Sequence, residues 1–187
     1  MAITVKRIGF GQVEPNHLSA QRTAQIYAQL PAKADIEILE NGQFVKYDYA
    51  NNEVNFTGAG EWMLVFNEVK LYKNFWEESY KDFAMQKKNY TPGDSFAHVG
   101  MPELKGQMTP RVFKTNVGDI YTTNCIGGAN TSGSAEYAGI EVKVGDELSP
   151  NAQGFLALDG DGSIVFQVVK EYTMPDGQLA VKVMRIK

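Results

Sequence analysis

Apolar and small side chains recur at steps of three and four residues between Asn16 and Leu30. This spacing gathers them on one side of a helix and leaves glutamines on the other. Asn16 can cap the first turn, and Pro31 disfavours helical geometry at the residue before it. The pattern predicts one helix from Asn16 to Leu30. Its spaced positions are Ala20, Thr23, Ile26, Tyr27 and Leu30.

The stretch before this helix has no hydrophobic period, and Gly9 and Gly11 interrupt it. Glycines without a period favour irregular or extended chain. We therefore expect residues 1–15 to form an extended arm that lies outside the sheet core. A free arm of this kind becomes ordered when it lies on a partner surface.

Alternation of apolar and polar residues begins after the predicted helix, at residues 35–39, and continues at residues 43–48. Between the two stretches lies Asn41-Gly42, which is a strong tight-turn dipeptide. The pattern therefore predicts a β-hairpin over residues 35–48.

The next apolar stretches are shorter and denser. Asn51-Asn52 precedes a predicted strand at residues 53–56. The unbroken apolar run from Trp62 to Phe66 is typical of a strand that is covered on both faces. We expect Trp62 and Phe66 to anchor the core of this middle region.

The stretch from residue 74 to 111 has fewer regular signals. Trp76, Tyr80 and Phe83 have helical spacing, which predicts a short helix within residues 74–89. Glycine and proline then recur through residues 89–111, which favours a long loop. Long ordered loops in compact proteins are usually functional or held by neighbours.

Short strands joined by tight turns dominate the last third of the chain. Val117-Gly118-Asp119 divides a predicted strand pair or bent strand at residues 112–123, and Val144-Gly145-Asp146 has the same turn chemistry. We expect both tripeptides to be turns that introduce strands. Further strands are predicted at residues 154–158, 163–173 and 178–186, with turns at 159–162 and 175–177 and a flexible connector at 127–133.

These elements predict a mainly β fold with a minor α+β character. The expected organisation is an N-terminal arm with one helix at residues 1–31, a β-rich middle region with a long loop at 32–111, and a small C-terminal β-barrel or sandwich at 112–187. A meander of a few short strands must close or pack on itself to bury its faces.

The composition excludes several classes of protein. Of 187 residues, 43% are hydrophobic and 21% are charged, which excludes an intrinsically disordered chain. The formal charge of −4 provides no basic surface for nucleic acid, and Lys6-Arg7 and Lys87-Lys88 are isolated pairs. The longest apolar run is too short to span a membrane, and residues 1–7 do not read as the start of a secretory signal. We therefore expect the chain to fold in a cytoplasm.

Cys125 is the single cysteine, so an intramolecular disulfide is excluded. With His17 or His98 as a base, its thiolate could act as a nucleophile, and the same residues could join carboxylates at a zinc ion. Nothing in the sequence brings the three residues together. A small buried thiol at a strand end is the favoured role of Cys125.

Paired acidic residues and glycines invite other interpretations. Asp159-Gly160-Asp161-Gly162 lacks the further acidic positions of a calcium loop, and a tight hairpin turn explains it. Glu77-Glu78 lie side by side on one element and cannot flank a glycosidic bond. Neither Gly127-Gly128 nor the pair Gly9 and Gly11 has the Lys-Ser/Thr ending of a phosphate loop. We therefore predict no catalytic, cofactor-binding or metal-binding residue.

Strand and turn patterns at residues 14–31, 39–48, 64–72, 144–148 with Gly154, and 176–183 touch most of the chain. They are similar to those of tailed-bacteriophage virion structural proteins, particularly small capsid-decorating or auxiliary head proteins. The resemblance implies a β-rich domain fixed on a capsid shell, in a virion assembled in the bacterial host cytoplasm. The implied partners are the major capsid protein and neighbouring copies of the chain, with no cofactor and no catalytic residue.

The residue patterns favour the same class of function. An arm outside the core, a glutamine-rich helix face and long loops suit a protein that its neighbours order. We expect residues 1–31 and the 89–111 loop to bind assembled capsid subunits. The alternatives are a head–tail connector, head fibre or tail component, and a carbohydrate-binding module that uses aromatic residues between Phe75 and Tyr90, including Trp76. An enzyme is the least favoured class.

Overall fold

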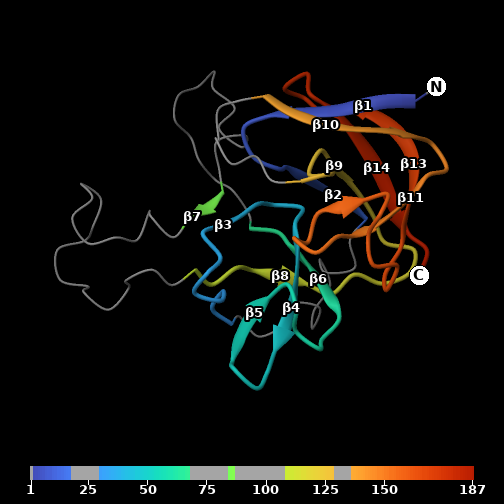
Figure 1. Ribbon diagram of the computed structural model, residues 1–187. Coiled ribbons are helices and arrows are strands. Elements are labelled where there is room, and N and C mark those ends of the chain that lie inside the picture. The colour runs from blue at the N-terminus through green and yellow to red at the C-terminus, as the bar shows by residue number, and fades with distance from the viewer. Residues whose placement is uncertain (1, 18–29, 68–83, 87–107, 129–135) are drawn as a thin grey trace, which may run out of the picture.

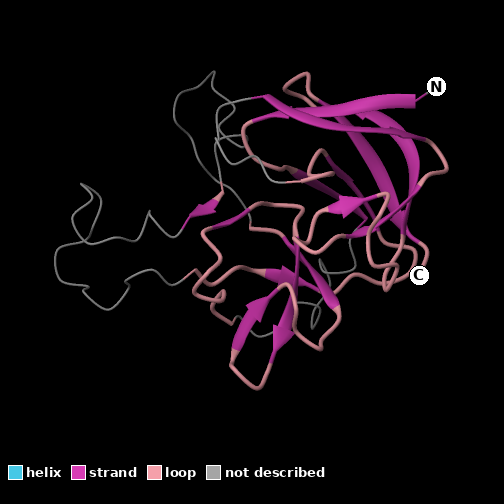
Figure 2. Ribbon diagram, in the orientation of Figure 1, coloured by secondary structure: helices cyan, strands magenta, loops and turns pink. Residues whose placement is uncertain are grey.

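The computed structural model describes residues 2–17, 30–67, 84–86, 108–128 and 136–187 (Figure 1). Over these residues the chain forms fourteen β-strands and no helix (Figure 2). The strands are β1 (Ala2–Ile8), β2 (Val13–His17), β3 (Ile38–Leu39), β4 (Phe44–Asp48), β5 (Glu53–Asn55), β6 (Trp62–Val65), β7 (Met85–Gln86), β8 (Val112–Phe113), β9 (Ile120–Thr123), β10 (Glu136–Lys143), β11 (Glu147–Pro150), β12 (Leu156–Ala157), β13 (Phe166–Thr173) and β14 (Leu179–Arg185).

The largest sheet has six antiparallel strands in the order β12-β11-β13-β14-β9-β2 and curls into a half-barrel (Figure 1). Its central hairpin, β13–β14, pairs Phe166 with Arg185. Val181 and Val183 of β14 are buried, whereas Lys182 between them is only half-buried. This period of two is the alternation expected of a strand with one face on a core.

A two-stranded sheet of β1 and β10 lies beside the central hairpin (Figure 1). Val5 of β1 and Val142 of β10 are fully buried in the same core as the half-barrel. The two-stranded sheet therefore covers part of the half-barrel core and is not a separate layer.

A four-stranded antiparallel sheet, β5-β4-β6-β8, forms the lower part of the molecule in Figure 1. Trp62 and Leu64 of β6 belong to the half-barrel core, whereas Met63 and Val65 belong to a second cluster on the opposite face. The prediction that this run is covered on both faces is confirmed. Phe66 is half-buried and lies 5.7 Å from the ring of Phe113.

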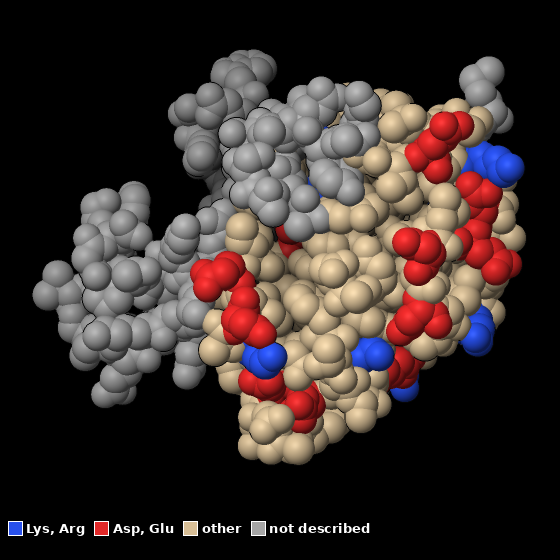
Figure 3. Space-filling view, viewed as in Figure 1, with Lys and Arg blue, Asp and Glu red and all other residues tan. Residues whose placement is uncertain are grey.

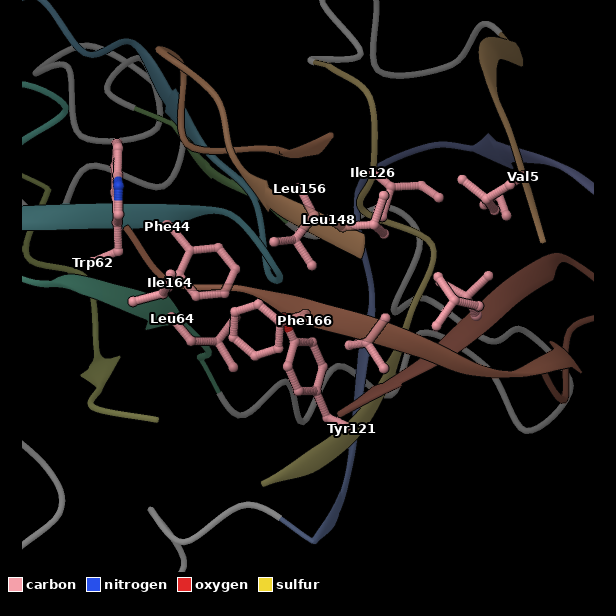
Figure 4. Close-up of a cluster of buried hydrophobic side chains, with 14 residues drawn as sticks. Val5, Phe44, Trp62, Leu64, Tyr121, Ile126, Leu148, Leu156, Ile164 and Phe166 are labelled. Carbon is pink, nitrogen blue, oxygen red and sulfur yellow. The ribbon is translucent and has the colours of Figure 1, made fainter. Parts of the chain in front are cut away.

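The larger core fills the space between the half-barrel and the four-stranded sheet (Figure 4). The ring of Phe166 lies 5.5 Å from that of Phe44 and meets Tyr121 edge-on at 5.7 Å. Val5 from residues 1–31, Leu64 from 32–111 and Phe166 from 112–187 all belong to this core. The predicted division of the chain at these boundaries stays a prediction.

The two Val-Gly-Asp tripeptides form equivalent turns. Gly118 and Gly145 have φ angles of 92° and 98°, and the amides of Asp119 and Asp146 donate to the carbonyls of Asn116 and Lys143, three residues back. Each Asp carboxylate accepts in return from the first backbone amide of its turn. These are type II turns, in which a positive φ at the third position favours glycine. They introduce β9 and β11, so the prediction that both tripeptides are turns before strands is confirmed.

The expectation of an N-terminal arm outside the core is wrong. β1 pairs with β10 from Ala2–Lys143 to Ile8–Glu136, and β2 pairs with β9. Val5 and Phe10 are buried. The partner strands lie more than 100 residues along the chain, and a local hydrophobic period cannot reveal such distant pairing.

The predicted helix from Asn16 to Leu30 is not supported. Asn16 and His17 lie in β2, where His17 pairs with Ile120, and Leu30 is not helical. Residues 18–29 lie outside the described part. Pairing with β9 thus outweighs the capping tendency of Asn16. In the part of the chain that the structure describes, no helix is long and apolar enough to cross a membrane.

The predicted hairpin over residues 35–48 is also wrong, although its turn exists. Gly42 has φ 96° and the Gln43 amide donates to Glu40 O, but Asn41 has no positive φ. A two-residue hairpin of the predicted type needs positive φ at both central positions, and a type II turn splays the strands. β3 consequently pairs with β7, whereas β4 pairs with β5 and β6.

The predicted C-terminal strands and turns are present as β12, β13, β14 and the turns between them. Where the sequence predicts a small barrel or sandwich, the sheet is an open half-barrel, and its core is covered by β1, β10 and the four-stranded sheet. β10 was not predicted. Within the helix predicted in residues 74–89, Met85 and Gln86 form strand β7, and residues 74–83 and 87–89 lie outside the described part. Most of the predicted loop, at 89–107, and of the predicted connector, at 129–133, also lie outside the described part.

Candidate functional site

A buried ion pair joins the N-terminal strand to the turn after β3. Nη2 of Arg7 donates to both carboxylate oxygens of Glu40, at 3.2 and 3.0 Å, and to the carbonyl of Gly128 at 2.7 Å. The side chains of both charged residues are at most 2% exposed. The Phe155 ring lies 5.9 Å from the guanidinium carbon. A buried charge is tolerated only with close, hydrogen-bonded partners, and Arg7 and Glu40 provide these for each other.

The backbone beside this pair is tightly enclosed. The amide of Gly11 donates to Glu40 Oε2 at 2.7 Å. A Cβ atom on Gly11 would lie 2.5 Å from Asn41 O and from Cys125 Sγ, so a larger residue does not fit. The glycine that the sequence suggested to be part of a loose arm is therefore required by a close approach of three chain segments.

Cys125 is fully buried against this cluster. Burial raises the pKa of its thiol well above the ordinary value, and the Glu40 carboxylate raises it further while Arg7 opposes the shift. Its amide donates to Oγ1 of Thr123 at 2.9 Å. A neutral, enclosed thiol is a poor nucleophile, because the thiolate is the reactive form.

Residues 38–41 form a junction with other stretches of the chain. Ile38 and Leu39 pair with Gln86 and Met85. The side-chain oxygen of Asn41 accepts from the Asn67 amide at 2.8 Å, and its Nδ2 donates to the Asn67 carbonyl at 3.2 Å. Together with the bonds of Arg7 to Glu40 and Gly128, these contacts bring five stretches that are distant in sequence to one place.

A second set of polar contacts joins the four-stranded sheet to the turn before β13. Trp62 Nε1 donates to Asp161 Oδ2 at 2.7 Å, and the Lys46 ammonium lies 4.5 Å from the Trp62 ring centre and 3.8 Å from the same carboxylate oxygen. Partial burial alone would raise the pKa of Asp161, but hydrogen bonds from Ser163 and Trp62 hold this pKa below its usual value. Asp161 is thus a structural acceptor.

Glu61 forms a third cross-link between the sheets. Its carboxylate accepts from Arg185 Nη2 at 2.8 Å and lies 3.0 Å from Lys114 Nζ. Arg185 also donates to the carbonyl and the hydroxyl of Thr115. Partial burial alone would raise the pKa of Glu61, but the bonds from Lys114 and Arg185 hold it below the ordinary value.

Residues near the tip of the β13–β14 hairpin form polar contacts with residues 12–14 of the N-terminal segment. Gln12 Nε2 donates to Asp176 Oδ2 at 3.1 Å, and the Gln12 amide donates to Asn124 Oδ1 at 2.8 Å. The charge of Glu14 and a hydrogen bond with it raise the pKa of Tyr172. Each of these bonds joins residues more than 100 positions apart.

Other residues considered from the sequence have ordinary positions. Asp159 and Asp161 lie in the turn between β12 and β13, and Asp161 caps it by accepting from the Ser163 amide at 2.9 Å. His98 and Glu77-Glu78 lie outside the described residues, and of His17 only the backbone is described. Over the described ranges no three His, Cys, Asp or Glu residues lie close enough to hold a metal ion.

Large apolar side chains are exposed mainly at turns. Val117 and Val144, at the tips of the matched turns, are 67% and 54% exposed. The turn amides of Gly118 and Gly145 donate to Arg185 O and Val168 O, and these acceptors lie near the paired ends of β14 and β13. Both turns therefore lie at the same end of the central hairpin. Leu158 and Leu179 are also exposed, the latter at the opposite end.

Aromatic residues between Phe75 and Tyr90, including Trp76, lie outside the described part. Among the described residues, Tyr49 at the β4–β5 turn is the exposed aromatic side chain, at 65%. Its ring centre lies 5.3 Å from that of Tyr47. Trp62 is buried and has Lys46 on its ring, so it offers no surface for a sugar.

Acidic residues dominate the charged surface of the view in Figure 3, with few lysines or arginines between them. This distribution agrees with the formal charge of −4 for the whole chain.

Comparisons of this chain with protein-family models, curated proteins and solved structures find no match.

The Arg7–Glu40 pair was not predicted, because Arg7 reads as one of two basic residues near the N-terminus and Glu40 as a turn-flanking acid. A weak signal existed in the alternation of residues 3–7, where Ile3, Val5 and Arg7 share one face of a strand. An arginine on a face with apolar residues indicates a buried partner.

Proposed function

We propose that the chain is a non-enzymatic structural protein of a tailed-bacteriophage virion that binds and stabilises the capsid as a decoration or auxiliary head protein. The partners in this proposal are the major capsid protein and neighbouring copies of the chain. The resemblance of its strand and turn patterns to such proteins motivates the assignment.

The observation that carries the proposal is how the described polar groups are used. Arg7–Glu40, Trp62–Asp161 and the Glu61–Arg185 pair each join two parts of the fold that are distant in sequence. The charged and polar side chains of these three pairs thus hold parts of the fold together. A scaffold fastened in this way suits a protein that must keep its shape within a large assembly.

The exposed valines of the matched turns supply a candidate contact surface. Val117 and Val144 are more than half exposed at one end of the central hairpin. Apolar side chains held on rigid turns can bury area against a partner without losing much conformational freedom. We therefore propose these valines as the capsid contact in place of the N-terminal residues of the predicted arm, since β1 and β2 are paired within the fold.

Co-sedimentation with purified capsids tests the proposal. We expect the full chain to pellet with capsids and the double variant Val117→Asp/Val144→Asp to remain in the supernatant. Leu179→Asp is the matched control, because it adds a charge at the opposite end of the same hairpin and is expected to leave binding intact. A full chain that never pellets with capsids would contradict the function. Binding that survives in the double variant would contradict only the contact surface.

A further inference from the structure

The N-terminal segment, residues 2–17, packs against strands that come from much later parts of the described chain. It carries β1 and β2, which join two different sheets as the partners of β10 and β9. Between these strands, residues 9–11 are buried beside the Arg7–Glu40 pair. Figure 1 shows the segment in blue, passing between the two-stranded sheet and the half-barrel.

The bonds that hold this segment reach residues far away in sequence. Arg7 contacts Glu40 and Gly128, which are 33 and 121 positions away, and Gln12 contacts Asp176 across 164 positions. These contacts depend on the shape of the receiving surface and not on continuity of the chain. We call this receiving surface, formed by Glu40, Asn124, Asp176, β9 and β10, the slot.

The slot is selective for this segment. Glu40 is buried and needs a cation at the position of Arg7, since an unpaired buried carboxylate is strongly unfavourable. The space beside Asn41 and Cys125 admits only a glycine, which Gly11 provides. Charge and shape therefore identify the occupant as residues 2–17 of this same protein.

Twelve residues, 18–29, separate the segment from Leu30 in the sequence. A chain of this length spans at most about 40 Å when extended. A protein of this size has a radius of gyration of about 16 Å. The connection is thus long enough to reach the slot of a neighbouring copy that lies against the first.

We propose that residues 2–17 exchange between copies of this protein, so that the slot of one copy receives the segment of the next. Exchange preserves the described contacts between the segment and its slot. Copies held side by side in an assembly present slots at high effective concentration, which favours exchange. The inference concerns contacts between copies and holds whatever larger partner the protein binds.

A pair of engineered cysteines tests the exchange. Val5 and Ile140 are opposed in the β1–β10 register, so Val5→Cys/Ile140→Cys in a Cys125→Ser background cross-links a segment to its slot. Oxidised protein is analysed on a denaturing, non-reducing gel. We expect most of the chain in covalent dimers or longer ladders. Covalently closed monomers alone would overturn the proposal.

The matched control places both cysteines outside the segment. Thr123 and Val181 are opposed in the β9–β14 register, so Thr123→Cys/Val181→Cys in the same background can only cross-link within one copy. This control is expected to give monomers. Equal ladders from both pairs would reveal unspecific cross-linking and would also count against exchange.

Complementary charge reversal provides a second test that needs no cross-link. Arg7→Glu and Glu40→Arg each place like charges together, so each variant alone is expected to be poorly soluble. In co-expressed chains, exchange brings the native Arg7 of one copy to the native Glu40 of the other. We expect soluble hetero-oligomers at least several-fold above either variant alone. No gain in soluble protein on co-expression would contradict exchange, because pairing within one chain cannot rescue either variant.

Discussion

Arg7 and Glu40 show how single buried residues organise this protein. Their charges are removed from water, and Nη2 of Arg7 and the Glu40 carboxylate are held by their mutual hydrogen bonds and by the bonds from Gly11 and to Gly128. Removing one member of such a pair leaves an isolated buried charge, which is more costly than the pair itself is favourable. The N-terminal strand therefore depends on one side-chain contact as well as on its ladder with β10.

The variant Arg7→Ala is expected to lower the free energy of unfolding by about 3–5 kcal/mol, because Glu40 remains buried without its cation. Urea denaturation followed by tryptophan fluorescence measures this loss. Lys33→Ala is the control, since Lys33 pairs with Asp35 at the exposed surface and its loss should hardly move the midpoint. Similar midpoints for Arg7→Ala and the wild type would contradict a structural role of the pair.

The thiol of Cys125 is expected to resist alkylation in the folded protein. Burial raises its pKa, so at pH 8 the neutral thiol dominates and reagents cannot reach it. Labelling by iodoacetamide, followed by mass spectrometry, should become fast only in denaturing urea. Rapid labelling of the native protein would show that the cluster around Glu40 opens readily.

At the scale of elements, turns decide which strands pair. The matched turns before β9 and β11 place those strands on the outer sides of the β13–β14 hairpin through the same two backbone bonds. The turn at Asn41-Gly42 instead directs β3 and β4 into different sheets. A glycine with positive φ therefore precedes a strand of the six-stranded sheet at two of these turns, and a strand of the four-stranded sheet at the third.

Two glycine substitutions separate steric from conformational requirements. Gly11→Ala is expected to destabilise strongly, because the new Cβ would lie 2.5 Å from backbone and sulfur atoms. Gly145→Ala meets open space but keeps φ 98°, so its cost should be about 1 kcal/mol. Thermal unfolding of both variants measures the difference. Equal melting temperatures would contradict the close approach at Gly11.

The sequence predicted elements that depend on local chemistry, such as the C-terminal turns, the β13–β14 hairpin and the fully covered strand β6. The prediction from sequence was wrong where pairing between strands distant in sequence determines the structure. Residues 1–15 lack a clear hydrophobic period, yet they contribute strands that pair with β9 and β10. The predicted absence of catalytic and metal-binding residues stays a prediction, and the Arg7–Glu40 pair was missed because its members lie 33 positions apart.

At the scale of the whole molecule, the half-barrel and the four-stranded sheet share one core and are cross-linked at its border. The larger cluster takes Phe44 and Leu64 from one sheet and Phe166 from the other (Figure 4). Glu61–Arg185 and Trp62–Asp161 join the same two sheets by polar contacts. Apolar burial supplies cohesion, and the polar contacts fix the relative orientation of the sheets.

Acid is expected to weaken this connection. The pKa values of Glu61 and Asp161 are lowered in the folded protein by their hydrogen-bond donors. A lowered folded pKa adds stability that is present above the unfolded pKa and is lost as the pH falls through the folded value. Unfolding free energies should therefore fall below pH 4, and Glu61→Gln/Asp161→Asn should flatten this fall. An unchanged acid dependence in the double variant would contradict the role of these carboxylates.

We propose above that this scaffold is a capsid-bound component of a phage particle, and cryo-electron microscopy of phage particles purified from lysates that contain the chain tests this proposal. We expect density on the capsid shell that fits the half-barrel, with the Val117 and Val144 turns against the major capsid protein and segments 2–17 shared between adjacent copies. Particles in which no density fits the half-barrel, and from which the chain is absent by mass spectrometry, would contradict the claim.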